Sequence, residues 1–411
     1  MTILRLALTT TLLLSVLSLH AQPGCTDPMA SNYDPQAQQN DGSCIYPPTA
    51  YQPPLVCLLD PLASEVSGLV WHDGILWGIN DSGDGPTLYA LDTLTGAIAG
   101  QATVAAATNV DWEALTRSDT HLFVADVGNN DGDRSVLRIY RIALDQLGSS
   151  ATLTPDIIQF SYEDWDESLP PEEKQDFDCE AVVFFGDSLH LFTKGWNSFQ
   201  TKHYVLPATP GNHTALLRQA FDSNGQITDA AVDPAGALVL LGYNVQTAES
   251  FLWLLYDTPM QPPPAWDPFS KNKRRIALGS ALTNGQTEAL VFPRPGYGLI
   301  GSEAIGPLEA RLLRLGTQQW WSAPTLSAEP HLQHHFQIRP FAYGLEFVWG
   351  GAFPLDMYLF ELSGRPMASF RLSANATWRW HSNNVPSGVY FYAGYSPWGQ
   401  RVVSGTLQVT R

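Results

Sequence analysis

Short apolar runs separated by polar turns recur along most of the chain, and one pair of runs occurs five times. In one copy an apolar run begins after Glu113, turns at residues 118–120, and is followed by a second run that ends at Asp126. Runs of about four to eight aliphatic, β-branched and aromatic residues bounded by turn residues are typical of β-strands, so the pair predicts an antiparallel hairpin. In such a hairpin the start of the first strand and the end of the second lie at the same edge. The other copies begin at Glu65, Glu180, Asp229 and Glu288.

The spacing of these copies predicts the architecture. The five acids are separated by 48, 67, 49 and 59 residues, and the longest interval contains a polar insert at 162–176. A third apolar run follows each hairpin, for example at 136–142 and 251–256. Periods of about 40 to 50 residues with several short strands each are typical of propeller blades. We therefore predict an all-β chain with a β-propeller at 54–322, of five blades with six as the alternative, in which the run at 54–59 closes the ring.

A different pattern begins at about residue 333. Alternating strands with Gly-containing turns continue to residue 411 and predict a small immunoglobulin-like β-sandwich. This stretch, 333–411, resembles the type IX secretion sorting domain at Pro340, at the Leu-Ser-Gly-Arg turn 362–365, at the Pro-Ser-Gly-Val-Tyr-Phe-Tyr strand 386–392 and at the last strand 407–411. The resemblance implies passage across the outer membrane by the type IX secretion machinery, followed by release or attachment at the cell surface.

The first 21 residues have the parts of a signal peptide. Arg5 supplies the positive charge, residues 6–19 form the apolar stretch, and residues 19–21 read Leu-His-Ala, a small-residue cleavage site. The apolar stretch is too short for a transmembrane helix, and no later stretch reaches spanning length. We therefore predict that 1–21 is a signal peptide, that the protein is secreted or held at the outer-membrane cell surface, and that it has no transmembrane segment.

The sequence of residues 22–47 predicts a small module bracketed by two cysteines and followed by a linker. In an exported protein Cys25 and Cys44 predict a disulfide. The module resembles the thrombospondin-type-3-like repeat through Gly-Cys-Thr-Asp-Pro at 24–28 and Asp-Gly-Ser-Cys at 41–44, with Ser31 in place of its usual middle cysteine. Its oxygen-bearing side chains suit Ca²⁺, and the equal alternative is that they only form turns. These side chains are Asp27, Asn32, Asp34 and Asp41.

The remaining cysteines and a histidine cluster have simpler interpretations. Cys57 and Cys179 each lie in a predicted strand, where buried free thiols are favoured. His331, His334 and His335 lie in a predicted linker, where solvated side chains are favoured over a metal site.

The amino-acid composition limits the classes of molecule that the protein can bind. The chain has 411 residues and a net charge of −18, with 44% hydrophobic and 15% charged residues. The large apolar fraction favours a large β core over disorder. The negative charge, without a basic patch, excludes nucleic acid as a partner. The surplus of acids fits either general solubility or the binding of cations.

The acids that begin the hairpins are the candidate chemistry. The first strand of each blade lines the channel of a propeller, so these acids are expected to form one ring, with the ends of the second strands at the same rim. Crowded carboxylates repel one another and require a cation, a cationic partner or raised pKa values, and oxygen-rich sites favour Ca²⁺. The predicted Ca²⁺ ligands are Asp111, Glu113, Asp126, Asp178 and Glu180. The residues predicted to contact a small-molecule or surface ligand are Glu65, Asp81, Trp112, Lys194, Asp229, Glu288 and Glu303.

Three interpretations of function stay open, and they differ on whether the protein is an enzyme. The leading one is an exported binding propeller with Ca²⁺ in its channel. The repeat region also loosely resembles β-propeller phytases at 111–114, 126–130 and 139–141, which implies a Ca²⁺-dependent phosphoester or ester hydrolase. A dense basic surface around Lys194 would favour that hydrolase. The third interpretation is a non-catalytic surface scaffold, in which the acids only bond backbone amides.

Overall fold

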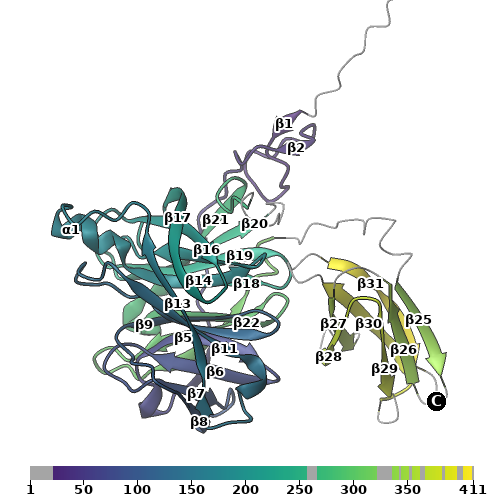
Figure 1. Cartoon of the computed structure of the whole chain (residues 1–411). Helices are drawn as coiled ribbons and strands as arrows, with labels where there is room; N and C mark the ends of the chain where they lie inside the picture. The colour runs from purple at the N-terminus through teal and green to yellow at the C-terminus, as the bar shows by residue number, and fades with distance from the viewer. Residues whose placement is uncertain are drawn as a thin grey trace, which may run out of the picture.

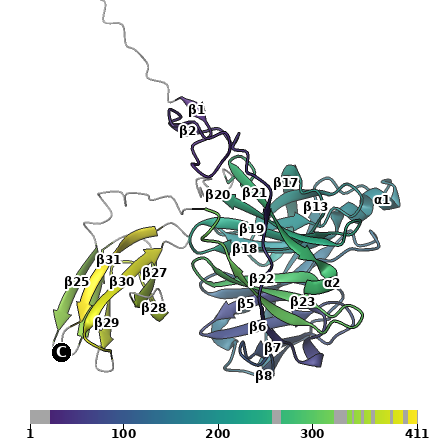
Figure 2. The same ribbon diagram turned by 180° about the vertical axis from the view of Figure 1, so that it is seen from behind.

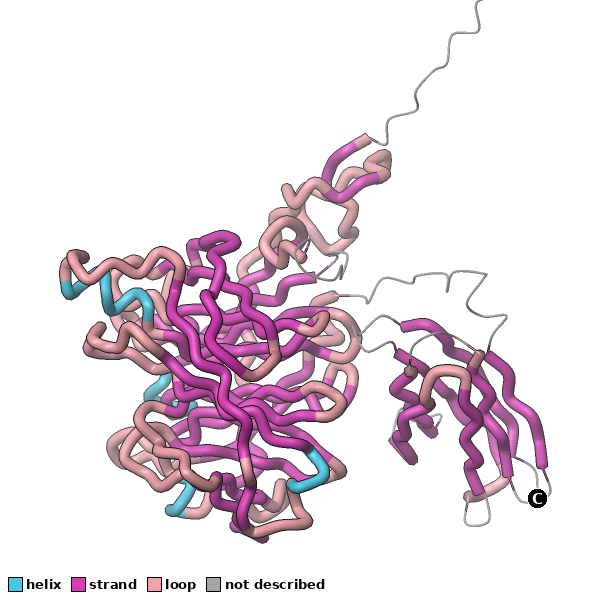
Figure 3. The backbone as a smooth tube through the Cα atoms, viewed as in Figure 1, coloured by secondary structure: helices cyan, strands magenta, loops and turns pink. Residues whose placement is uncertain are grey.

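The structure is a computed structural model that describes residues 22–256, 266–321, 336–341, 344–350, 354–361, 366–381, 385–395 and 401–409. Most of these residues lie in strands, and the helices are single short turns (Figure 3). Three elements of the sequence analysis lie outside the described residues. These are the signal peptide 1–21, the three linker histidines within 331–335, and the turn 362–365 of the predicted sorting domain.

Five four-stranded antiparallel sheets form the body of the protein, and each has the strand order of a propeller blade. Blade 1 contains β5 (Val66–His72), β6 (Ile75–Asn80), β7 (Thr87–Leu91) and β8 (Ile98–Val104), and blade 2 contains β9 (Trp112–Arg117), β10 (His121–Asp126), β11 (Leu137–Ala143) and β13 (Pro155–Tyr162). Blade 3 contains β14 (Cys179–Phe185), β15 (Ser188–Thr193), β16 (Gln200–Pro207) and β17 (Gly211–Asp222). Blade 4 contains β18 (Gln226–Asp233), β19 (Ala237–Asn244), β20 (Glu249–Tyr256) and β21 (Asn272–Ser280), and blade 5 contains β22 (Gln286–Arg294), β23 (Tyr297–Glu303), β24 (Arg311–Gly316) and β4 (Leu55–Leu58).

The ring is closed by a strand from the start of the propeller. β4 pairs antiparallel with β24, so an early segment supplies the outer strand of the last blade. Figure 2 shows the purple N-terminal segment running along the green blades to reach this place. The five first strands neighbour one another in the order β5, β9, β14, β18, β22 and back to β5. The prediction of five blades closed by the run at 54–59 is therefore confirmed.

Five apolar clusters hold the ring together, one between each pair of adjacent blades. Strand side chains point alternately to opposite faces, so each second strand serves two clusters. On β10, Leu122 and Val124 pack toward blade 1, whereas Phe123 and Ala125 pack toward blade 3. Both faces of the inner strands are therefore buried, and this explains their unbroken apolar runs.

Smaller elements join the blades at their outer edges. β13 and β17 pair in parallel, which merges blades 2 and 3 into one eight-stranded sheet. The two-residue strands β12 (Thr152–Leu153) and β3 (Thr49–Ala50) pair in parallel with β8 and β21. The helical turns are η1 (Pro61–Ala63), η2 (Leu144–Gln146), α1 (Pro171–Lys174), η3 (Gln175–Phe177) and α2 (Ala281–Asn284). Among the described residues, no helix is both long enough and apolar enough to cross a membrane.

The N-terminal module is small and docks on blade 4. β1 (Pro23–Gly24) and β2 (Gln39–Asn40) form its two-stranded sheet, and Cys25 and Cys44 form the predicted disulfide. Cys57 and Cys179 are free and buried, as expected. The Asp27 carboxylate accepts a hydrogen bond from the Tyr256 hydroxyl of blade 4 at 2.6 Å. The module is therefore joined to the propeller by polar contacts as well as by the chain.

The C-terminal region forms two facing sheets beside the propeller (Figure 1). One contains β25 (Phe336–Phe341), β26 (Gly344–Trp349) and β29 (Ala376–His381). The other contains β28 (Pro366–Leu372), β27 (Leu355–Glu361), β30 (Gly388–Tyr395) and β31 (Arg401–Val409). Residues of both sheets, such as Phe347 and Met357, share one apolar core. The predicted β-sandwich is confirmed as a fold.

Candidate functional site

Every first strand carries a β-bulge at the same place, close to its start. A bulge places an extra residue opposite the partner strand, so that this residue leaves the pairing and its side chain is redirected. In β9 the pairing passes from Trp112 to Ala114, and Glu113 is the extra residue. The equivalent residues in blades 1 to 5 are Ser67, Glu113, Glu180, Thr228 and Glu288.

The register of two blades differs from the sequence prediction. Glu65 and Asp229 were expected to share the ring position with the three glutamates, but Ser67 and Thr228 occupy it. Glu65 lies two residues earlier and is exposed at the rim. Asp229 lies one residue later and accepts hydrogen bonds from the backbone N–H groups of Ala230 and Leu290. It therefore ties blade 4 to blade 5.

The two bulge hydroxyls also connect neighbouring blades. Ser67 Oγ donates to the carbonyl of Trp112 at 2.6 Å, and Thr228 Oγ1 donates to the carbonyl of Thr287 at 2.7 Å. Each acceptor directly precedes the bulge glutamate of the next blade. The hydroxyls are thus fully used in holding the ring, whereas the glutamates of blades 2, 3 and 5 remain for the channel.

Two further layers of polar residues lie beside the bulges. Residues two apart in a strand share a direction, and the positions two before the bulges hold Glu65, Asp111, Asp178, Gln226 and Gln286. Opposite them, at or just past the ends of the second strands, lie the polar residues Asp81, Lys194, Tyr243 and Glu303 and the apolar Val127. This end of the channel therefore brings together carboxylates from blades 1, 2, 3 and 5, with Lys194 as the one cation among these positions.

The tightest group of carboxylates spans blades 1 and 2. One carboxylate oxygen each from Asp81, Asp111 and Glu113 lies within 4.8 Å of the other two. Gly128 makes this spacing possible, because a Cβ at that position would lie 2.3 Å from Asp111 Oδ2 and 2.8 Å from Glu113 Oε1. We call these three residues the Asp81–Asp111–Glu113 cluster. Its donors are hard oxygen atoms in a number and spacing that can hold a metal ion.

Protons are held more firmly here than on ordinary carboxyls. Burial, together with the charges of Asp81 and Asp178, raises the pKa of Asp111 to about 7. The pKa of Glu113 is raised well above its usual value, first by burial and then by Glu180 and other carboxylates. Burial also raises the pKa of Glu288 to about 7 and that of Glu303 to about 9. Such shifts mean that the cluster favours either protons or a bound cation.

Blade 3 contributes two carboxylates that already have hydrogen-bond donors or a cation as partners. Asp178 accepts hydrogen bonds from the backbone N–H of Asn129 at 2.5 Å and from Trp196 Nε1 at 2.7 Å. Glu180 Oε1 lies 2.5 Å from Lys194 Nζ. Burial lowers the pKa of Lys194, but Glu180 and Glu288 outweigh it and raise that pKa well above its usual value. Lys194 is therefore a fixed positive charge in the channel wall.

Two other predicted site residues lie away from the channel. Asp126 is buried and pairs with Arg134 at 2.7 Å, and its Oδ1 also accepts from the Asp111 backbone N–H. Trp112 is fully buried in the core between blades 1 and 2, where it packs against Tyr140. The indole near the charged groups is instead that of Trp196, beneath the Lys194 ammonium. Sequence reasoning did not identify Tyr243 or Gly128, although the hairpin register places both near the rim.

The opposite end of the ring has a different character. A cavity of about 490 Å³ is lined there by the far ends of the first strands, including Trp71, Phe184 and Phe292. Tyr358 and Arg371 of the sandwich form part of its wall. None of the acids described above lines this cavity, which has charged residues of its own, among them Asp73, Arg117 and Asp356.

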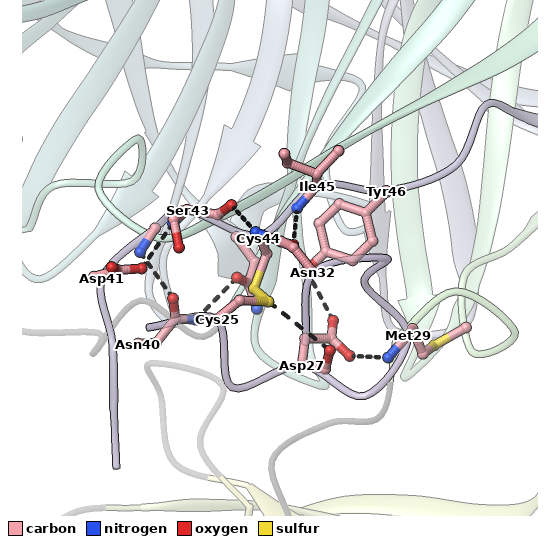
Figure 4. The surroundings of a disulfide bond; sticks show 12 residues. Cys25, Asp27, Met29, Asn32, Asn40, Asp41, Ser43, Cys44, Ile45 and Tyr46 are labelled. Carbon is pink, nitrogen blue, oxygen red and sulfur yellow. Dashed lines mark hydrogen bonds between the residues drawn. A yellow bond between two sulfur atoms is a disulfide. The ribbon is translucent and has the colours of Figure 1, made fainter. Parts of the chain in front are cut away.

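The oxygen atoms of the N-terminal module are engaged in turns. Asp27 Oδ1, Asp34 Oδ1 and Asp41 Oδ1 each accept from the backbone N–H two residues later, at 2.8, 2.8 and 3.0 Å. Asn32 Oδ1 accepts from the Ile45 N–H at 2.7 Å (Figure 4). The three aspartate bonds to the backbone two residues later are typical of Asx turns, whereas the Asn32 bond joins two distant parts of the module. This geometry favours the turn-forming alternative over Ca²⁺ binding in the module.

Comparison with known proteins adds fold likeness only. No family model and no curated protein matches this chain. Among solved structures it is similar to a hypothetical protein from Leishmania major (10% identity, 65% of this chain and 90% of the other, TM-score 0.37). It is also similar to a periplasmic gluconolactonase from Pseudomonas aeruginosa (14% identity, 82% and 96%, TM-score 0.29) and to the WD40 β-propeller domain of Doa1 (11% identity, 61% and 66%, TM-score 0.28). The assignment of the fold rests on the strand pairing described above: the chain is an all-β protein with a five-bladed propeller.

Proposed function

We propose that this protein is an exported propeller that binds Ca²⁺ at the acidic end of its channel and uses that end to hold a ligand. The observation that carries the proposal is the Asp81–Asp111–Glu113 cluster, in which three carboxylates from two blades converge within 4.8 Å. Like charges that are mostly buried this close together are costly unless a cation or protons compensate them. Export is supported by the sequence of residues 1–21 and by the resemblance of residues 333–411 to the type IX sorting domain.

The donor set fits Ca²⁺ better than a transition metal. The cluster offers only oxygen atoms, and neither cysteine nor histidine is part of it. Ca²⁺ takes six to eight oxygen ligands in flexible geometry, so three carboxylates can be completed by water or by a ligand in the channel. When bound, Ca²⁺ supplies positive charge that compensates the cluster. Asp81 and Glu113 then act as ligands whose positions the two blades fix.

A phosphoester hydrolase is less favoured by the same geometry. Such an enzyme needs cationic groups free to bind phosphate oxygens. Lys194 is the cation among the channel positions, and it is already paired with Glu180 at 2.5 Å. Arg134 is paired with Asp126 in the same way. The channel is therefore better suited to cations than to phosphate groups.

The test is a calorimetric Ca²⁺ titration of the full mature chain and of a Glu113→Gln variant, which keeps the side-chain size and removes one charge. We expect the wild type to bind Ca²⁺, and the variant to bind it at least about tenfold more weakly, because a ligand oxygen is lost. The matched control is Glu309→Gln at an exposed site, which should bind as the wild type does. No binding heat in the wild type, or equal affinity in Glu113→Gln, would refute the proposal.

A further inference from the structure

The side chain of Lys194 shows how residues of the channel wall surround an ammonium group. The Lys194 ammonium lies 2.5 Å from Glu180 Oε1, 4.5 Å from the centre of the Trp196 ring and 5.7 Å from that of Tyr243. A carboxylate oxygen with aromatic faces around it is a standard environment for a primary ammonium, because the oxygen accepts an N–H and the rings attract the charge. Glu180 is the bulge residue of blade 3.

The bulge residue of blade 5 lacks such a partner. Glu288 is only 5% exposed, and its Oε1 accepts from Gln286 Nε2 at 2.5 Å. Its Oε2 is buried and receives no hydrogen bond from any described residue. A buried carboxylate oxygen without a donor costs free energy that a bound donor would recover. Glu288 is therefore a buried acceptor with one carboxylate oxygen bonded and the other without a donor.

The surroundings of Glu288 contain carboxylates, an aromatic ring and the charge of Lys194, which opposes the rise in the pKa of Glu288 that burial causes. Glu303 of the same blade pairs with Gln286 across the hairpin, and Asp81 lies on the adjacent blade. Tyr243 lies on the other side, where the charge of Glu288 contributes to raising the pKa of its hydroxyl after burial does. The rim residues Tyr243 and Glu303 are partly exposed, whereas Glu288 is buried behind them.

We infer that Glu288 is the anchor of a second subsite, which binds a primary alkylammonium group in the channel beside the Ca²⁺ cluster. The inference rests on the proposed function only in placing Ca²⁺ at Asp81, Asp111 and Glu113, which leaves Glu288 free. A second metal ion is not favoured there. Among the described residues, the group of three carboxylates that could hold a metal ion does not include Glu288 or Glu303. The Gln286 amide also presents a donor, not an oxygen, to Glu288.

The probe for this subsite is chosen to match the side chain of Lys194. n-Butylammonium is the side chain of lysine as a free molecule, so it should bind Glu288 as Lys194 binds Glu180. The experiment is a calorimetric titration of n-butylammonium into the full mature chain saturated with Ca²⁺, with tetramethylammonium as a cation of the same charge that has no N–H. We expect n-butylammonium to bind and tetramethylammonium to bind at least about tenfold more weakly, since one charge-assisted hydrogen bond is lost.

Variants locate the subsite and separate it from the Ca²⁺ site. Glu288→Gln should weaken n-butylammonium binding by about 10- to 100-fold and leave the first Ca²⁺ affinity within about threefold of the wild type. Glu113→Gln should do the reverse, and unchanged thermal unfolding of each variant in Ca²⁺-free buffer would show that it is folded. A stronger response to Nα-acetyl-lysine amide than to n-butylammonium would assign the group to a peptide, and the opposite order to a small amine. Both orders support the subsite.

Three results would overturn the inference. One is the absence of n-butylammonium binding to wild type that has first been shown to bind Ca²⁺ in the same sample. Another is equal binding of n-butylammonium by Glu288→Gln. The third is a Ca²⁺ stoichiometry of two that falls to one in Glu288→Gln, because Glu288 would then be a metal ligand. Failure of the Ca²⁺ titration alone would count against the proposed function and would leave amine binding to be judged by the Glu288 variant.

Discussion

Gly128 is the position at which a single methyl group should disrupt the Asp81–Asp111–Glu113 cluster while leaving the fold in place. In Gly128→Ala the new Cβ would lie 2.3 Å from Asp111 Oδ2 and 2.4 Å from its Cγ, where ordinary contacts begin at 3.4 Å. The Asp111 carboxyl must therefore move by about 1 Å. Ca²⁺ ligands lie within a few tenths of an ångström of their ideal distances, so Asp111 is lost as a ligand. We expect Ca²⁺ affinity to fall by about 10- to 100-fold.

The backbone itself should tolerate the substitution. Gly128 does not adopt a positive φ, so alanine introduces no intrinsic strain. Overpacking costs about 1–3 kcal/mol when neighbours cannot move, and here the atoms that the new Cβ meets belong to side chains and not to the backbone. The matched control is Gly100→Ala on β8, whose Cβ would meet only Ala90 Cβ at 3.8 Å. It should change neither Ca²⁺ affinity nor the melting temperature by a measurable amount.

The assay is calorimetry with Ca²⁺ on the full mature chain, together with thermal unfolding with and without Ca²⁺. Because a ligand that binds the native state stabilises it, the wild type should melt at a higher temperature with Ca²⁺, whereas Gly128→Ala should respond much less. If Gly128→Ala bound Ca²⁺ as tightly as Gly100→Ala, the carboxylates would not bind metal in the arrangement described here. The reasoning would then be refuted even if the protein bound Ca²⁺ elsewhere.

Three more predictions follow from the structure. Calorimetry between about pH 5 and 7 should show that Ca²⁺ affinity rises with pH, by up to about tenfold per unit for each proton displaced, because the raised pKa values of Asp111 (about 7) and Glu113 let protons compete. Without Ca²⁺, the stability of the fold should decrease as pH rises through the same window, since the native state keeps protons that the unfolded chain loses near pH 4. Arg134→Ala should destabilise the fold by about 3–5 kcal/mol in denaturant titrations, because it leaves the buried Asp126 without its partner, whereas a similar loss in Asp126→Asn/Arg134→Ala would contradict that cause. Deleting residues 333–411 should leave the protein in the periplasm on cell fractionation, and its unchanged appearance in the medium or at the surface would reject the sorting assignment.

The architecture could be predicted because it depends on apolar runs. Each inner strand is buried on both faces, and so it reads as an unbroken apolar segment between turns. Ring closure by β4 could also be predicted, because the run at 54–59 has no hairpin partner of its own in the sequence. The number of blades and the closure of the ring can be inferred from the composition and spacing of the apolar runs alone. A shift of one residue in the pairing of any strand does not change either inference.

The residues that face the channel could be predicted only in part, because the pairing register of the strands decides which side chains point there. In blades 2, 3 and 5 the bulge glutamate is followed by alanine, as in Glu113-Ala114. Asp229-Ala230 has the same appearance, but there the bulge residue is Thr228. A shift of one residue turns a strand side chain to the opposite face, so Asp229 points toward blade 5 and not into the channel. The bulge depends on backbone pairing between strands, and a single sequence gives no direct sign of it.

The asymmetry of the ring follows from which residue occupies each bulge. In blade 1 the position after the bulge is Gly68, whose Cβ would lie 2.8 Å from the backbone nitrogen of Leu115 in the next blade. In blade 4 the same position is Asp229, and its carboxylate accepts from the corresponding N–H of Leu290. Contacts that join neighbouring blades are therefore made at this position and by the hydroxyls of Ser67 and Thr228. Because those contacts close the ring at blades 1 and 4, the three bulge glutamates need not serve the fold, and their surroundings differ. Glu113 lies beside other carboxylates, Glu180 pairs with Lys194, and Glu288 keeps one buried oxygen without a donor.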